Sequence, residues 1–277
     1  MKTANLVALF VVLLLNIHFS LAQTTDSTKK EKAQFKVSVN HNNGLNYYGR
    51  TDSLRSKGFF PLAELWIRSK FYVNAAPVFV YNKSQSFEYA GSVATIGYLN
   101  ISKKSIYNFY LLKPFYKESS EIVQSALKAQ TGASFTFLNK ILNISVGGDI
   151  KYSNQFDYGA MAGIDHVFRK QLKDQSVLAI NPSFTLSAGT QKFSNTYTKK
   201  TGGLLPRRQL VTENVQAFNL LSMEASLPVI YAKDKLQFIA TPAYVVPKNL
   251  LKAEGRPELS ETGRNLFYTT LAVKYSF

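Results

Sequence analysis

The last residues of the chain read NLFYTTLAVKYSF, from Asn265 to Phe277. Counting back from Phe277, every second residue is apolar or nearly so, while Ser276 and Lys274 lie between them. A period of two is typical of a β-strand whose two sides meet different surroundings. The stretch therefore predicts a strand that ends on an aromatic residue, and it raises the question of what covers its apolar side.

The same alternation recurs in the runs 141–152, 157–169 and 177–189. In each run one side is apolar, and the other is mostly small and polar, as in Asn181, Ser183 and Thr185. These runs are about twice the ~5–6 residues of a usual strand in a soluble protein. They match the ~9–11 residues of a tilted strand that crosses a bilayer. We therefore expect strands that span a membrane.

The spacing predicts one all-β domain, an antiparallel up-and-down transmembrane β-barrel of about 12 strands. Short turns, expected on the periplasmic side, alternate with longer extracellular loops at 42–58, 82–91, 115–128, 191–215 and 248–264; the short connection at 153–156 is the exception. Hydrocarbon does not tolerate unpaired backbone groups, so the sheet must close. The expected strands are 34–41, 59–67, 71–81, 92–101, 105–114, 129–138, 141–152, 157–169, 176–190, 216–231, 236–247 and 265–277.

The amino-terminal residues predict export. One Lys precedes the apolar run Leu6 to Leu15, and small residues, Ser20 and Ala22, precede an expected cleavage point. The run is shorter than the ~20 residues of a spanning helix, which disfavours the alternative of a membrane anchor. We expect a signal peptide at 1–22, a flexible periplasmic leader at 23–33 and the barrel at 34–277.

The final strand resembles the C-terminal sorting signal of Gram-negative outer-membrane β-barrel proteins. The resemblance rests on Phe267, Leu271, Val273, Tyr275 and Phe277. It implies location in the cell outer membrane and recognition of this strand by the barrel-assembly machinery. The alternative, an edge strand of a soluble periplasmic protein, would leave a long apolar edge exposed to aggregation.

Strand alternation places several charges on the expected inner face of the barrel. Two interpretations stay open: the charges pair and form a polar core, or they form a ring that sets the selectivity of a solute path. These residues are Glu64, Asp149, Lys151, Asp165, Arg169, Glu224 and Lys274, with Lys36 and Arg68 beside them.

The formal net charge is +16, and much of the basic excess falls in loops and turns. The stretch Asn195 to Leu210 alone carries Lys199, Lys200, Arg207 and Arg208. We expect such a patch to contact lipopolysaccharide phosphates or to attract anionic solutes; a plainly solvated loop is the alternative. Nucleic-acid binding is disfavoured, because the charge is scattered and the chain is exported.

No catalytic, nucleotide-binding or cofactor motif is present, and the absence of cysteine excludes thiolate metal sites. We therefore expect no cofactor and no metal, and we interpret the chain as a passive channel or transporter for small solutes. A structural or assembly barrel is the main alternative. A lipid-modifying enzyme is another, with His41 and His166 as its strongest candidate residues. The sequence does not decide whether the lumen is open.

Overall fold

The computed structural model describes residues 33–51, 54–84, 86–116, 127–201, 207–251 and 263–277, with only the backbone described at 192–201 and 207–216. The expected signal peptide and all but the last residue of the leader lie outside this part. No helix within the described residues is both long and apolar enough to cross a membrane.

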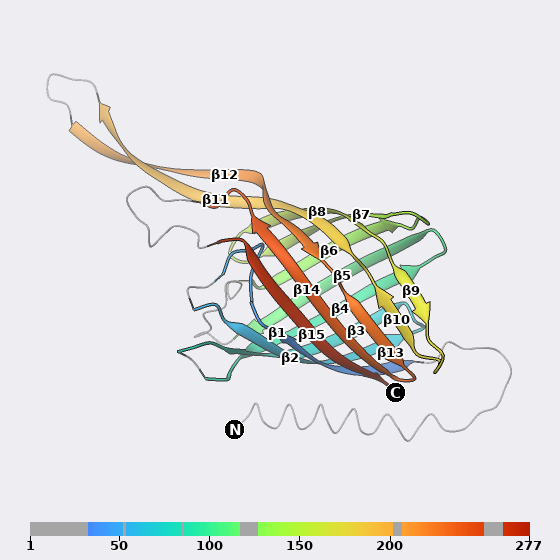
Figure 1. The fold of residues 1–277 in the computed structure, drawn as a ribbon. Helices are drawn as coiled ribbons and strands as arrows, with labels where there is room; N and C mark the ends of the chain where they lie inside the picture. The colour runs from blue at the N-terminus through green and yellow to red at the C-terminus, as the bar shows by residue number, and fades with distance from the viewer. Residues whose placement is uncertain (1–32, 52–53, 85, 117–126, 202–206, 252–262) are drawn as a thin grey trace. The chain divides into compact units, whose positions relative to one another are not determined.

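The described chain forms one antiparallel sheet of fifteen strand segments (Figure 1). They are β1 (Gln34–Asn42), β2 (Lys57–Ile67), β3 (Phe71–Tyr81), β4 (Glu88–Ile101), β5 (Ser105–Tyr116), β6 (Ala129–Phe137), β7 (Asn143–Tyr152), β8 (Phe156–Asp165), β9 (Phe168–Gln171), β10 (Val177–Ile180), β11 (Ser183–Thr201), β12 (Arg207–Ser226), β13 (Val229–Lys233), β14 (Leu236–Pro247) and β15 (Leu266–Ser276).

The sheet closes on itself. β1 pairs with β2 on one side and with β15 on the other, and β12 pairs with both β11 and β14. The register of the closing pair sets Lys36 opposite Ser276 and Asn42 opposite Thr270. Both ends of the barrel chain therefore lie at the same rim. The connections at this rim are the short turns, so it is the periplasmic rim.

Three of the twelve strands are each broken in two, and two of these breaks contain a proline. Pro182 separates β10 from β11, Pro228 separates β12 from β13, and a third break at His166 separates β8 from β9. Proline has no N–H to give to the ladder. Its carbonyl still accepts a bond, as from His166 N to Pro182 O at 3.2 Å and from Asn181 N to Pro228 O at 2.9 Å. The fifteen segments thus make twelve strands, which confirms the expected closed barrel.

One expected loop is wrong. Residues 191–215 were expected to connect two strands irregularly, but β11 continues to Thr201 and β12 begins at Arg207. Pairing of β11 with β8 ends at Gly189, and pairing of β12 with β14 ends at Ser222. Beyond these points the two strands pair only with each other and form a long ribbon (Figure 1). The run from Phe193 is rich in Thr, Tyr and Ser, which suit paired strands as well as loops.

The two faces of the wall differ sharply in chemistry. On β7, Ile144, Val146 and Ile150 are 51%, 50% and 42% exposed, and they alternate with Ser145 and Gly147 on the opposite face. Continuous apolar exposure of this kind is costly in water and suits the hydrocarbon of a bilayer. The apolar face is therefore the outer, lipid-facing belt, and the polar face lines the lumen.

The final strand follows the same rule. The five residues of the expected sorting signal all lie on the outer face of β15 or directly after it, and each is between 38% and 64% exposed: Phe267, Leu271, Val273, Tyr275 and Phe277. The lipid belt is thus what covers the apolar side of the last strand. Recognition by an assembly machinery stays a prediction.

Candidate functional site: the lumen and the loop that crosses it

The side chains on the inner wall of the barrel are small compared with the diameter of the barrel. Twelve strands spaced ~4.8 Å apart and tilted by ~40° enclose a backbone diameter of about 24 Å, whereas eight-stranded barrels are narrow enough for side chains to fill. On β11 the inner positions Ser183, Thr185 and Ser187 are small, as are Gly147 and Ser145 on β7. Side chains of this size leave most of such a width unfilled.

In one row around the inner wall, residues with a side chain alternate with glycines. The row follows the register of β3 to β8 and consists of Tyr72, Gly97, Tyr110, Gly132, Asp149 and Gly159. A β-carbon added at Gly97 would lie 2.2 Å from the Tyr72 ring, and one added at Gly132 would lie 2.6 Å from the Tyr110 ring. The tyrosines therefore lie flat over the neighbouring glycines instead of projecting across the lumen.

Most of the predicted inner charges meet a partner at the wall. Lys274 Nζ lies 2.8 Å from Glu64 Oε1, and Trp66 Nε1 donates to the other Glu64 oxygen at 2.9 Å. Glu64 is buried. The Lys36 ammonium lies over the Trp66 ring, 4.9 Å from its centroid. This group lies toward the periplasmic end of the lumen.

Three further predicted carboxylates have their own partners. Asn143 Nδ2 donates to Asp165 at 2.8 Å, and the Tyr268 hydroxyl donates to Glu224 at 2.9 Å. Asp149 forms an ion pair with Lys151 on the same strand.

Arg169 does not join these lumen charges. It lies on β9, beyond the break, where all four residues are exposed. The basic patch Lys199, Lys200, Arg207 and Arg208 lies on the paired backbone at the far end of the β11–β12 ribbon, and its side chains are outside the described part. The roles predicted for both sets stay predictions.

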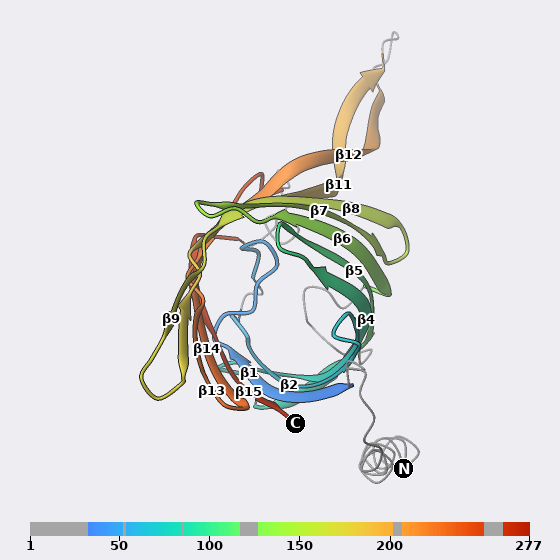
Figure 2. The ribbon, with the colours of Figure 1, turned by 90° about the vertical axis from the view of Figure 1, so that its right-hand side faces the viewer.

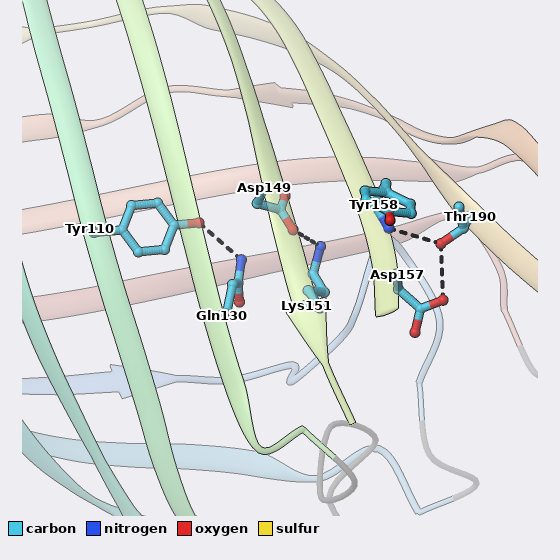
Figure 3. Close-up of polar contacts among 7 residues, drawn as sticks. All are labelled: Tyr110, Gln130, Asp149, Lys151, Asp157, Tyr158 and Thr190. Atoms are coloured by element: carbon cyan, nitrogen blue, oxygen red, sulfur yellow. Dashed lines mark hydrogen bonds and ion pairs between the residues drawn. The ribbon is translucent and has the colours of Figure 1, made fainter. Parts of the chain in front are cut away.

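The Asp149–Lys151 pair belongs to a polar strip near the extracellular end of the wall (Figure 3). On one side of the pair, Gln130 Nε2 donates to the Tyr110 hydroxyl at 2.9 Å. On the other side, the Thr190 hydroxyl donates to Asp157 at 2.9 Å. The strip therefore presents fixed donors and acceptors from β5 to β11.

The connection from β1 to β2 leaves the barrel at the extracellular end, as expected, and then turns into the lumen (Figure 2). Its tip is a tight turn in which Tyr47 and Arg50 exchange backbone hydrogen bonds of 2.8 and 3.0 Å. Tyr48 and Gly49 occupy the central positions with φ of 54° and 76°. Gly49 suits such a turn, but a bulky residue at positive φ is an outlier that the surroundings must hold. We call residues 43–51 and 54–56 the crossing loop.

Arg50 anchors the crossing loop to one wall. The side chain is 7% exposed, and its guanidinium donates to the carbonyl oxygens of Tyr48 at 3.3 Å, Leu221 at 3.1 Å and Lys248 at 3.2 Å. Leu221 lies on β12, and Lys248 follows β14 directly. A β-carbon on Gly49 would lie 2.9 Å from Pro247, so the turn is pressed closely against the same wall.

The tip of the loop reaches a different wall. The Lys151 ammonium lies 5.9 Å from the centroid of the Tyr48 ring. Lys151 is on β7, which is six strands from β1 in either direction around the twelve-stranded ring. A segment that leaves β1 therefore meets the diametrically opposite strand, so it crosses the lumen.

The tip is partly buried: Gly49 and Arg50 are buried, and Tyr47 and Tyr48 are half-buried. Burial raises the pKa of the Tyr47 hydroxyl well above its ordinary value, and the nearby Tyr48, Asp149 and Asp157 act in the same direction, while Arg50 opposes them. Tyr47 therefore stays a neutral hydrogen-bonding group at any ordinary pH. Together the tip and the polar strip form a narrow zone of neutral hydroxyls and paired charges.

Neither His41 nor His166 takes part in this zone. His41 Nε2 is hydrogen-bonded to the Tyr81 hydroxyl at 2.7 Å, and the His166 ring packs edge-on against Phe168. Within the described residues no group of three His, Asp or Glu side chains could hold a metal ion. The sequence prediction missed the crossing loop, although the stretch Asn46-Tyr-Tyr-Gly-Arg50 carries a turn signal with two aromatic residues.

No protein-family model and no curated protein matches the chain. Among solved structures it is similar to a KdgM porin, with 9% identity over 87% of this chain and 99% of the other and a TM-score of 0.47. An outer membrane channel from Pseudomonas putida F1 has 11% identity over 92% and 100% of the two chains, with a TM-score of 0.43. LpxR from Salmonella typhimurium has 8% identity over 87% and 99%, with a TM-score of 0.41. The closed barrel and its lipid belt give the chain the fold of an outer-membrane β-barrel protein.

Proposed function

We propose that the protein is a passive channel for small polar solutes, with its narrowest zone beside the crossing loop, at the level where the loop tip meets β7. The observation that carries this proposal is the Arg50 anchor, which fixes the loop across a barrel about 24 Å wide. Tyrosines lying flat on glycines keep the rest of the wall thin. A polar wall with one fixed constriction suits passage limited by solute size.

The charges along this path are balanced, although the whole chain is strongly basic. Among the described residues, the inward positive groups are Arg50, Lys36, Lys151 and Lys274. The inward negative groups are Glu64, Asp149, Asp157, Asp165 and Glu224. Because a ring of one sign is what gives a pore strong charge selectivity, we expect only a weak preference between cations and anions.

The test compares Tyr48→Ala with Tyr152→Ala in single-channel recordings. Tyr48 lies at the tip of the crossing loop, whereas Tyr152 is 40% exposed on the outer face of β7, one residue after Lys151. Both changes remove the same atoms. We expect larger conductance for Tyr48→Ala and no change for Tyr152→Ala.

Two outcomes would contradict the proposal in different ways. Equal conductance of wild type and Tyr48→Ala would mean that the constriction lies elsewhere. Absence of current from both, with normal insertion into the bilayer, would mean that the loop plugs the barrel, and would favour the structural role.

A further inference from the structure

The periplasmic rim of the barrel is strongly and unevenly charged. Its turns and the β9 segment carry ten basic residues and two acidic ones, Asp174 and Asp234, all of them exposed. We call the ten basic residues the periplasmic basic rim: Arg68, Lys70, Lys103, Lys104, Lys140, Arg169, Lys170, Lys173, Lys233 and Lys235.

Within the described part of the chain, most of these cations have no acidic partner. Lys233 Nζ lies 3.1 Å from Asp174 Oδ2. The other nine form no ion pair with any described residue. Like charges gathered at one end of a molecule repel each other, so the arrangement favours a partner that brings negative charge.

Three turns of the rim adjoin exposed apolar side chains. Ile141, next to Lys140, is 82% exposed, Ile101 before the Lys103 turn is 66% exposed, and Phe71 after Lys70 is 52% exposed. Side chains this exposed would be unfavourable in water, but they fit the boundary between acyl chains and head groups. A cation directly beside such an anchor lies at the depth of the lipid phosphates.

The backbone of one turn gives a second indication. Arg68 and Ser69 have φ of 51° and 53°, and Lys70 N donates to Ile67 O at 3.2 Å. Gly or Asn is the easier choice at both central positions of such a hairpin turn. The turn therefore keeps an arginine although its backbone conformation is unfavourable for that residue. This indicates that the positive charge has a role at this position.

We propose that the periplasmic basic rim binds the phosphate groups of anionic phospholipids, such as phosphatidylglycerol, in the inner leaflet of the outer membrane. The apolar anchors beside the cations favour a lipid over an acidic protein or glycan, which would meet these side chains in water. The proposal does not depend on whether the lumen conducts.

The experiment is native mass spectrometry of the barrel released from micelles containing equal amounts of phosphatidylglycerol and phosphatidylethanolamine. One variant carries Lys103→Gln, Lys104→Gln, Lys140→Gln and Lys173→Gln. A matched control removes four exposed lysines at the other end, as Lys57→Gln, Lys83→Gln, Lys113→Gln and Lys128→Gln. Heat-modifiable gel migration establishes that both variants are folded.

We expect wild type and the extracellular control to retain phosphatidylglycerol in preference to phosphatidylethanolamine, and the periplasmic variant to lose that preference several-fold. The preference should fall as salt rises. Excess soluble glycerol phosphate should not displace the lipid, because it lacks the acyl chains that the apolar anchors contact.

Unchanged phosphatidylglycerol retention in the periplasmic variant would overturn the proposal and leave an acidic protein or glycan as the partner. Equal loss in both variants would show that net charge alone attracts the lipid. Displacement by glycerol phosphate would show a phosphate site without lipid specificity. Loss of lipid preference together with unchanged conductance would separate this inference from the channel proposal.

Discussion

Replacing Arg50 with Ala should release the crossing loop from the wall. Two of the guanidinium bonds, to the oxygens of Leu221 and Lys248, join the loop to the barrel. Hydrogen bonds to a charged group contribute ~1.5–3 kcal/mol each. Water in the lumen replaces part of this, so we take the lower end for both, about 3 kcal/mol. That corresponds to a shift on the order of 100-fold toward the undocked loop.

The assay is single-channel recording of Arg50→Ala beside wild type. An undocked loop no longer holds its tip against β7, so we expect a larger mean conductance and more current noise. The conductance of Arg50→Lys should lie between those of wild type and Arg50→Ala. A lysine ammonium cannot donate to carbonyl oxygens of separate segments as the planar guanidinium does. Arg55→Ala is the control, since Arg55 is an exposed arginine of the same loop. Identical conductance and noise in Arg50→Ala and wild type would refute the anchoring argument.

Three further predictions concern the wall, one turn and the last residue. Gly97→Ala should lower the free energy of unfolding by ~1–3 kcal/mol in urea titrations, because the new methyl group would overlap the Tyr72 ring. Hydrogen bonds from the Ser176 hydroxyl and from Lys233 lower the pKa of Asp174 to about 2, so NMR should show its carboxyl titrating there, and Ser176→Ala should raise that midpoint. Deleting Phe277 should reduce the amount of folded protein in the outer membrane, measured by heat-modifiable migration in isolated membranes.

The predictions for the wall and for the last residue each have a result that would contradict them. Gly148→Ala is the control for the wall, because an added β-carbon there would meet nothing nearer than 3.3 Å, and equal stability of the two alanine variants would contradict the packing argument. For the last residue, normal levels of inserted protein after deletion would remove the sorting interpretation.

The sign of the Asp174 effect follows from its lowered pKa. The folded turn favours the carboxylate, so its contribution to stability is present above the unfolded-state pKa of ~3.9 and is lost as the pH falls through about 2. Asp174 is exposed, so salt should weaken the effect. A midpoint near the unfolded value would show that the hydrogen bonds do not persist in solution.

The alternation of side chains predicted the barrel because each lipid-facing position is decided locally. Ile144 and Ser145 are neighbours in a strand and therefore point to opposite faces. Their difference in polarity decides which of the two faces meets lipid. The same local rule placed Glu64 and Lys274 on one face, although only the closure between β1 and β15 brings them together.

The crossing loop could not be predicted in this way. Its path depends on bonds between Arg50 and the carbonyl oxygens of Leu221 and Lys248, which are far away in sequence. Backbone carbonyls carry no signature in the sequence, so no residue pattern reveals such an anchor. The extent of the β11–β12 ribbon was missed for a related reason, since Thr, Tyr and Ser occur both in loops and in paired strands.

The most direct test of the channel proposal is the single-channel conductance of the purified, folded wild-type barrel in a planar bilayer under a salt gradient. We predict discrete current steps with a reversal potential near zero, because the proposed path runs beside the loop and its charges are balanced. Stable insertion without current steps would contradict this account and show that the crossing loop closes the barrel.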